Sequence, residues 1–177
     1  ISVDKYNEII EKMTLDELCG QLLCYTAPLG CYKDELDNFE KIVKRTKPGG
    51  IFVASGTKAE IDDITAMINQ YTKVPVIVAG DTENGPNPVK DCALRLPHPM
   101  AWGACDDADA VEKGGMLTAR LCRQNGIHWS FAPLVDINYN KDNPVVNTRA
   151  VSDSPEQVVK IAGAYLRGIQ KEGLMAG

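Results

Sequence analysis

The sequence predicts an α/β fold with a parallel sheet. Short apolar runs typical of buried strands alternate with amphipathic segments of ten or more residues, the pattern of βαβ units. The run VIVAG, residues 76–80, is apolar throughout, as expected of a strand that a parallel sheet buries on both faces. The chain has 177 residues, 44% hydrophobic and 24% charged, which suits one ordinary core. We therefore expect residues 1–177 to form a single domain.

The first half of the chain predicts helices and strands in alternation. Residues 4–13 form the first expected helix. Thr14 begins a second helix, because Glu17 three residues later completes a capping box, and Thr57 with Glu60 repeats this signal. The expected strands are 21–27, 51–54 after the breaker 48–50, and 76–80. The expected helical faces are Leu36, Phe39, Ile42 and Val43, and later Ile61, Ile64, Ile68 and Tyr71.

The second half predicts two long helices around one strand. A loop over 81–99 precedes a helix over 108–124, which Gly126 ends, and the small residues Gly114 and Gly115 would let that helix approach a sheet closely. A strand over 127–135 follows, and Ser154 with Pro155 opens a helix that Gly173 closes. Residues 174–177 begin another apolar segment. The expected inner faces are Ala110, Gly114, Leu117 and Leu121, then Val158, Ile161, Tyr165 and Ile169.

Two architectures fit this order of elements, an open doubly wound sheet and a closed (β/α) barrel. In both, ligands bind at the carboxyl ends of the strands. Asp81 follows the strand 76–80, and Asp136 follows the strand 127–135 and opens a long polar loop that ends at Arg149. No Gly-x-Gly-x-x-Gly or Gly-Lys-Ser/Thr motif is present, so the sequence gives little support for a binding site for a dinucleotide or a nucleoside triphosphate.

Composition disfavours several classes of partner and site. The net charge is −5 and the 19 Lys and Arg residues are scattered, so the composition disfavours binding of nucleic acid. No apolar run approaches the roughly 20 residues that span a bilayer, and the amino terminus lacks the pattern of a signal peptide, so we expect a cytoplasmic protein. Six cysteines without Cys-x-x-Cys spacing predict reduced thiols and no metal site, with a disulfide at Cys31 as the alternative.

Four ordered segments resemble the amino-terminal barrel of family-three glycoside hydrolases. They cover most of the chain from about residue 13, and the resemblance is to the β-N-acetylhexosaminidase and β-glucosidase branch. It implies a parallel-stranded partial TIM (β/α)₈ barrel, a retaining hydrolase acting on β-N-acetylglucosaminides or β-glucosides, and no metal or organic cofactor. The segments are VPVIVAGDTENGP (74–86), LPHPMAWGA (96–104), GIHWSFAPLVDINYNKDNPVVNTRAVSDSPEQV (126–158) and AGAYLRGIQKEGLMAG (162–177).

The resemblance implies that Asp81 and Arg149 bind the sugar of the −1 subsite. The five fixed donors of an arginine suit paired sugar oxygens, so we expect Arg149 to present a guanidinium fork to vicinal hydroxyls. Without the resemblance, Asp81 is equally well a turn cap and Arg149 a salt-bridged loop residue. Asp136 is expected to hold the loop and Glu83 to be a solvated turn residue. The segment TENGPNPVK lacks the arginine that many hexosaminidases carry here. We therefore expect the contacts that this segment makes with the sugar hydroxyls or the aglycone to differ.

No residue of this chain is predicted to be catalytic. The family's Lys-His-Phe-Pro-Gly-His-Gly segment would follow residue 177, and its nucleophilic Asp comes later still. We therefore expect the chain to be an amino-terminal portion of a barrel, to hydrolyse no glycoside alone, and to form a homodimer or to associate with the missing carboxyl-terminal part. The alternative is a non-catalytic, saccharide-binding or assembly remnant of the barrel. An aldolase-like enzyme is disfavoured because no strand ends in a suitable Lys.

Overall fold

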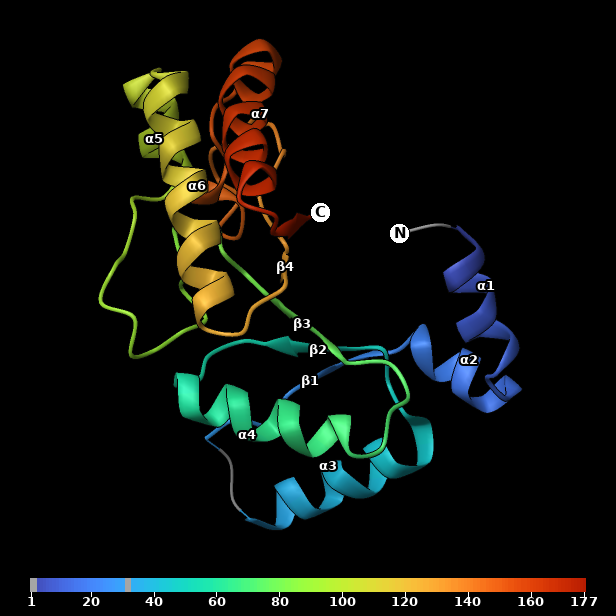
Figure 1. The fold of residues 1–177 in the computed structure, drawn as a ribbon. Coiled ribbons are helices and arrows are strands. Elements are labelled where there is room, and N and C mark those ends of the chain that lie inside the picture. The colour runs from blue at the N-terminus through green and yellow to red at the C-terminus, as the bar shows by residue number, and fades with distance from the viewer. Residues whose placement is uncertain (1–2, 31–32) are drawn as a thin grey trace.

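The computed structural model describes residues 3–30 and 33–177. Its five strands are all parallel and lie in chain order, β1-β2-β3-β4-β5 (Figure 1). This order distinguishes the two expected architectures, because a doubly wound sheet reverses its strand order at a switch point whereas a barrel continues around. The sheet therefore follows the barrel path. The strands are β1 Cys24–Thr26, β2 Gly50–Val53, β3 Ile77–Gly80, β4 Trp129–Ser130 and β5 Met175–Ala176.

Apart from the first two helices, which lie by themselves near the amino terminus, the helices form two groups along the sheet (Figure 1). α3 and α4 lie together beside β1 and β2, while α6 and α7 pack along each other near β4 and β5. One buried apolar cluster joins both groups to the strands, so the chain has a continuous core. The helices are α1 Val3–Glu11, α2 Leu15–Gln21, α3 Lys33–Thr46, α4 Lys58–Asn69, α5 Pro99–Cys105, α6 Ala108–Gln124 and α7 Pro155–Lys171.

The predicted helix starts are confirmed. Thr14 with Glu17, and Thr57 with Glu60, form complete capping boxes in which the side chains and backbone N–H groups bond reciprocally. Ser154 accepts a hydrogen bond from the Gln157 backbone N–H at the start of α7. These local bonds satisfy N–H groups that the first helical turn leaves without partners. They explain why short sequence signals located these boundaries.

The inner faces of two helices differ from the expectation. Leu36 and Ile42 of α3 are 39% and 37% exposed, whereas Phe39 and Val43 are buried as expected. In α6 Leu117 is 39% exposed, and Ala110 and Leu121 are only partly buried, so that predicted stripe was wrong except at Gly114. The buried face of α6 is one residue further along, at Val111, Gly114, Gly115, Thr118, Ala119 and Cys122.

Glycines explain why the buried face of α6 is shifted by one residue from the predicted one. A Cβ placed on Gly115 would lie 2.5 Å from the Tyr165 carbonyl oxygen, and one on Gly168 would lie 2.1 Å from the Glu112 carbonyl oxygen. α6 and α7 therefore touch backbone to backbone. Gly114 meets the Trp102 ring, at 3.0 Å from such a Cβ. The expectation that Gly114 and Gly115 approach a sheet was wrong, because both face other helices.

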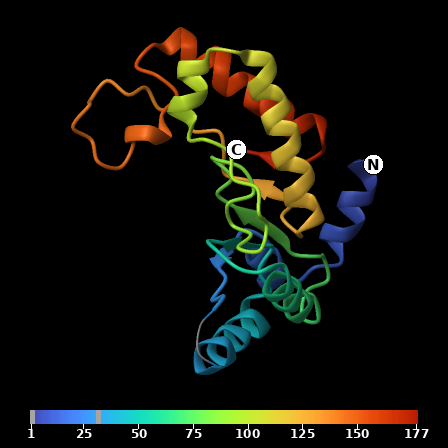
Figure 2. The ribbon, with the colours of Figure 1, turned by 90° about the vertical axis from the view of Figure 1, so that its left-hand side faces the viewer.

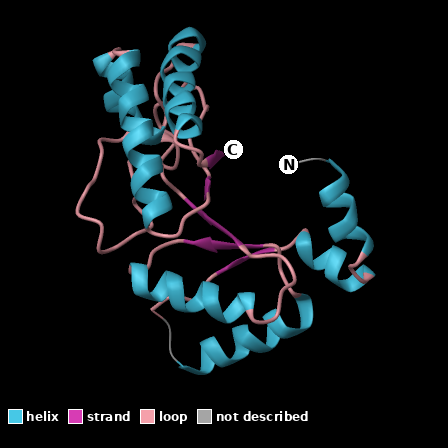
Figure 3. Ribbon diagram, viewed as in Figure 1, coloured by secondary structure: helices cyan, strands magenta, loops and turns pink. Residues whose placement is uncertain are grey.

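Two connections also differ from the expectation. The strand expected over 127–135 is only Trp129–Ser130: the Ala132 N–H already bonds to the Ser130 hydroxyl rather than to a neighbouring strand, and Pro133 then has no N–H to offer. The segment after β4 then projects as a loop beyond the helices, orange in Figure 2. The loop after β3 ends in α5, a short helix that was not predicted although Pro99 occupies its first turn (Figure 3).

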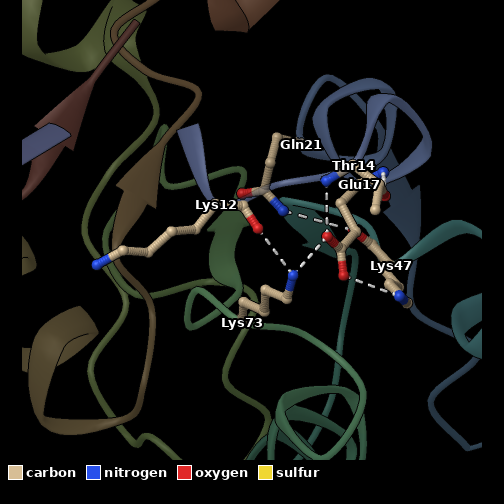
Figure 4. Close-up of polar contacts among 6 residues, drawn as sticks. All are labelled: Lys12, Thr14, Glu17, Gln21, Lys47 and Lys73. Atoms are coloured by element: carbon tan, nitrogen blue, oxygen red, sulfur yellow. Dashed lines mark hydrogen bonds and ion pairs between the residues drawn. The ribbon is translucent and has the colours of Figure 1, made fainter. Parts of the chain in front are cut away.

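A buried carboxylate fastens α2 at the amino ends of the strands (Figure 4). Glu17 Oε1 accepts a 2.9 Å hydrogen bond from Lys47, just before β2, and Oε2 accepts one of 2.8 Å from Lys73, just before β3. The Glu17 side chain is 7% exposed and the two lysines are 38% and 53% exposed. One carboxylate therefore joins α2 to two separate loops.

Candidate functional site

The two predicted site residues lie at the carboxyl ends of the strands. Asp81 follows β3 directly, and Arg149 is the last residue of a short 3₁₀ helix, Asn147–Arg149, in the loop that follows β4. Arg149 hydrogen-bonds to Glu83, two residues after Asp81, and the charges of Asp81 and Arg149 act on each other's pKa. The structure thus brings together two residues that are 68 positions apart in the chain.

Glu83 is the direct partner of Arg149. Arg149 Nε donates to Glu83 Oε2 at 2.9 Å and to Oε1 at 3.2 Å, and Nη2 donates to Oε1 at 2.6 Å. The side chain of Glu83 is 11% exposed and that of Arg149 is 40% exposed. This two-pronged contact is the strong form of an arginine–carboxylate pair. The expectation of a solvated turn residue at Glu83 was therefore wrong.

Asp81 remains outside this ion pair. Partial burial and the negative charge of Glu83 raise the pKa of the Asp81 carboxyl, and the positive charge of Arg149 opposes them. Asp81 is nevertheless exposed, which leaves its carboxylate accessible to a ligand. The guanidinium of Arg149 thus pairs with Glu83, while Asp81 senses its charge and is available to accept hydrogen bonds.

A buried polar network supports the turn between Asp81 and Glu83. The Tyr165 hydroxyl of α7 donates to the Thr82 carbonyl oxygen at 2.6 Å and contacts Thr118 Oγ1 of α6 at 3.1 Å. Thr82 Oγ1 and Ser130 Oγ, at the end of β4, are 2.6 Å apart. All four residues are buried. Hydrogen-bonded groups in such a setting fix the backbone firmly, because unmaking them would leave buried polar atoms without partners.

Asparagines hold the loop that carries Arg149. Asn140 Oδ1 accepts from the Asp142 N–H, and Asn143 Oδ1 accepts from the N–H groups of Val145 and Val146. These are local turns of the kind that asparagine favours. Asp136 is exposed. The hydrogen bonds to Glu83 are the main cause of the raised pKa of Arg149, and the negative charge of Asp136 adds a smaller contribution.

The remaining candidates have structural surroundings. Trp129 is partly buried and lies edge-on to Phe131, with ring centroids 4.7 Å apart. Within residues 3–30 and 33–177, no group of three or more His, Cys, Asp or Glu side chains could hold a metal ion. The described cysteines are free thiols, and Cys31 lies outside the described residues. No described helix is long and apolar enough to cross a membrane.

Comparison with known proteins identifies the family. The model of the glycosyl hydrolase family 3 N-terminal domain matches residues 14–177. The chain belongs to glycosyl hydrolase family 3. A "Beta-N-acetylglucosaminidase/beta-glucosidase" of Cellulomonas fimi is 28% identical over 94% of this chain, and a "Beta-hexosaminidase" of Tolumonas auensis is 29% identical over 83%. The matches span 29% and 45% of those proteins, so this family 3 chain covers less than half of each relative.

Solved structures of other proteins share this fold. A "Beta-glucoside phosphorylase BglX bound to 2FGlc" superposes on 99% of the chain with a TM-score of 0.86 and 26% identity, over 32% of its own length. A family 3 β-N-acetylglucosaminidase from Paenibacillus superposes on 93% with a TM-score of 0.79 and 26% identity, also over 32% of its length. The predicted family and the predicted parallel-stranded partial barrel are confirmed.

Proposed function

We propose that this chain is the sugar-binding portion of a retaining family 3 glycoside hydrolase acting on β-N-acetylglucosaminides or β-glucosides. One observation carries the proposal: the exposed residue Asp81 and the partly exposed Arg149 lie together at the carboxyl ends of β3 and β4. Barrel enzymes place their active sites at this face. The names of the relatives support the substrate class.

The two groups have complementary roles in this proposal. Asp81 accepts hydrogen bonds from sugar hydroxyls, while Arg149 donates them from the part of its guanidinium that Glu83 does not occupy. Together they orient the −1 sugar, so that binding energy is directed to the distorted transition state. The nucleophilic carboxylate and the acid/base group come from a part of the parent protein outside residues 1–177. The chain alone therefore binds sugar and hydrolyses none.

The exposed edges of the sheet suggest how the chain associates with other polypeptides. β1 and β5 are the outermost strands of the order β1-β2-β3-β4-β5. Strand edges carry unpaired backbone groups that invite pairing. We propose that the carboxyl-terminal part of the parent protein covers the β5 edge, and that the isolated chain covers it by forming a homodimer.

The test uses the full-length parent protein and 4-nitrophenyl β-glycosides. We expect turnover by the wild type and a loss of about a hundredfold or more in kcat/KM for Asp81→Asn and Arg149→Met, since each removes a charged contact to the sugar. Asp109→Asn, on the exposed first turn of α6, is the control and should keep full activity. Unchanged kcat/KM in both site variants would refute the proposed site.

The same assay separates two other functions. Saccharide binding without turnover by the full-length protein would favour the non-catalytic alternative. Turnover that requires added phosphate would favour transfer to phosphate, which the structural likeness to a β-glucoside phosphorylase makes a specific candidate. Hydrolysis that proceeds without phosphate would support the proposal.

A further inference from the structure

We propose that Glu83 is a positioning residue, which fixes Arg149 so that one edge of its guanidinium is held and the other is presented to the ligand. This inference deepens the proposed function and rests on it for the identity of the ligand. Glu83 touches no ligand itself in this assignment. It acts by setting where the donors of Arg149 point.

The donors of Arg149 divide into two sets. Glu83 takes the Nε–H and one Nη2–H through contacts of 2.6–3.2 Å. Nη1 has a long contact of 3.5 Å with the Val145 carbonyl oxygen. An arginine has five N–H groups, so the outer pair on Nη1 and Nη2 remains for hydroxyl oxygens. Glu83 occupies the Nε side of the guanidinium, so the fork that remains for the sugar is the outer Nη1/Nη2 pair.

Exposure shows which partner faces the ligand. The Glu83 side chain is 11% exposed and that of Arg149 is 40% exposed. A carboxylate this covered has little surface to offer a sugar. Arg149 keeps enough surface to bind while one edge stays anchored. This asymmetry assigns Glu83 to positioning and Arg149 to contact.

Glu83 is itself held on both sides. The preceding residue, Thr82, has its carbonyl oxygen bonded to the Tyr165 hydroxyl at 2.6 Å. The following residue, Asn84, has its carbonyl oxygen bonded to the Leu96 N–H at 2.9 Å. The turn is thus anchored to α7 and to the returning loop. Through its ion pair, the carboxylate on this anchored turn fixes the position of the Arg149 side chain in the long loop.

Glu83 also keeps Arg149 away from Asp81. Both carboxylates act on the same guanidinium, and only Glu83 makes a direct ion pair with it. If the charge of Glu83 were removed, the carboxylates whose charges still act on Arg149 would be Asp81 and Asp136. An ion pair between Arg149 and Asp81 would occupy both groups that are proposed to bind sugar. Loss of Glu83 should therefore weaken ligand binding without removing any ligand contact.

The test compares Glu83→Gln with Glu112→Gln in the full-length protein. Glu112 is a matched control, because it also pairs with cations, Arg167 and Lys171, but on the surface of α6 and α7. We expect Glu83→Gln to raise KM for a 4-nitrophenyl β-glycoside, and Kd for the corresponding methyl β-glycoside, by about tenfold or more, the scale of a lost charge-assisted contact. The value of kcat should change less, and Glu112→Gln should stay within about twofold of wild type.

A spectroscopic readout tests the position of Arg149 without any ligand. In the wild type, the Arg149 Nε–H should give a slowly exchanging proton resonance in nitrogen-labelled protein, since both oxygens of Glu83 cover it. Glu83→Gln should speed this exchange, and Glu83→Asp, which retains the charge with a shorter reach, should fall between the two. Adding Arg149→Lys should abolish the effect of Glu83→Gln on KM, because no fork is left to orient.

The outcomes separate this inference from the proposed function. If the wild type binds or turns over no saccharide, the proposed function fails while the Nε–H exchange still decides the positioning role. If the wild type is active and Glu83→Gln leaves both KM and the exchange rate unchanged, the positioning role is refuted and the proposed function stands. If Glu83→Gln does not fold, Glu83→Asp decides by the same two measurements.

Discussion

The Tyr165 hydroxyl donates a 2.6 Å hydrogen bond to the Thr82 carbonyl oxygen and so ties α7 to the turn between Asp81 and Glu83. The phenol is buried, with 4% of Tyr165 exposed, and burial raises its pKa. Because it stays neutral, the hydroxyl remains a donor to Thr82 while its oxygen contacts Thr118 at 3.1 Å. The helix layer thereby determines where the site's turn lies.

Tyr165→Phe should lower the free energy of unfolding by about 1–3 kcal/mol, because it leaves the buried Thr82 carbonyl and Thr118 hydroxyl with fewer partners while the ring still fills its space. Urea unfolding of the two proteins measures this. Tyr6→Phe, at a side chain that is 53% exposed, is the control and should change the value by less than about 0.5 kcal/mol. Equal effects at the two positions would contradict a role for the buried network.

The ion cluster at Glu17 predicts a stability that depends on pH. Hydrogen bonds from Lys73, the Thr14 backbone and Lys47 lower the pKa of Glu17 from 4.5 to about 2. A depressed pKa contributes stability that is fully present above the unfolded value and is lost as the pH falls from about 4.5 through about 2. Glu17→Gln should therefore be less stable than wild type at pH 7, and the difference should shrink over that range.

Thermal unfolding between pH 7 and pH 2 measures the Glu17 effect. Asp16→Asn, at the exposed neighbouring residue of α2, is the control and should follow the wild-type curve more closely. A constant difference between Glu17→Gln and wild type across the whole range would show that packing, rather than the ionised carboxylate, holds α2 in place.

The part of the fold that was predictable rests on local chemistry. The capping boxes at Thr14 and Thr57 involve residues three apart, and the bounds of α6 follow from the Asp107 cap and the positive φ of Gly126. The position of Asp81 follows from the rule that residues after parallel strands face the ligand side. The residues that interact in these features are only a few positions apart, so the sequence alone is enough to predict them.

The missed features depend on contacts between distant segments. Glu83 and Arg149 are 66 positions apart, and no local pattern indicates which of Asp81, Glu83 and Asp136 pairs with the arginine. The rotation of α6 depends on backbone contact with α7, which hydrophobic spacing cannot reveal because glycine has no side chain to count.

The helix contact at Gly168 makes a prediction with a matched control in the same helix. Gly168→Ala should destabilise the protein by about 1–3 kcal/mol, because its Cβ would lie 2.1 Å from the Glu112 carbonyl oxygen and force the helices apart. At Gly163 the nearest atom to such a Cβ is the flexible Arg167 Nη1 at 3.5 Å, so Gly163→Ala should stabilise by about 0.4–1 kcal/mol. Urea unfolding gives both values, and the same sign at both sites would contradict the close packing.

The charges around Asp81 predict how its titration responds to its neighbours. Burial and the Glu83 carboxylate raise its pKa, while Arg149 lowers it. Glu83→Gln should therefore shift the Asp81 titration to lower pH, and Arg149→Met should shift it to higher pH. The carbon resonance of the Asp81 carboxyl, followed against pH in the ligand-free protein, measures both shifts. Saccharide affinity in the wild type should fall on acidification as this carboxylate gains its proton, since it then loses its capacity as an acceptor.

Glu17 provides the control for the Asp81 titration. It lies at the amino ends of the strands, and its low pKa comes from Lys73, Thr14 and Lys47, none of which the two site variants alter. Its titration should be the same in all three proteins. Shifts of Asp81 in one common direction in both variants would mean that the substitutions act by changing burial rather than charge. Opposite shifts of the Asp81 titration, with an unchanged Glu17 titration, would establish that the charges of Asp81, Glu83 and Arg149 act on one another. In that arrangement Glu83 neutralises the charge of Arg149, and Asp81 remains available to accept hydrogen bonds from the ligand.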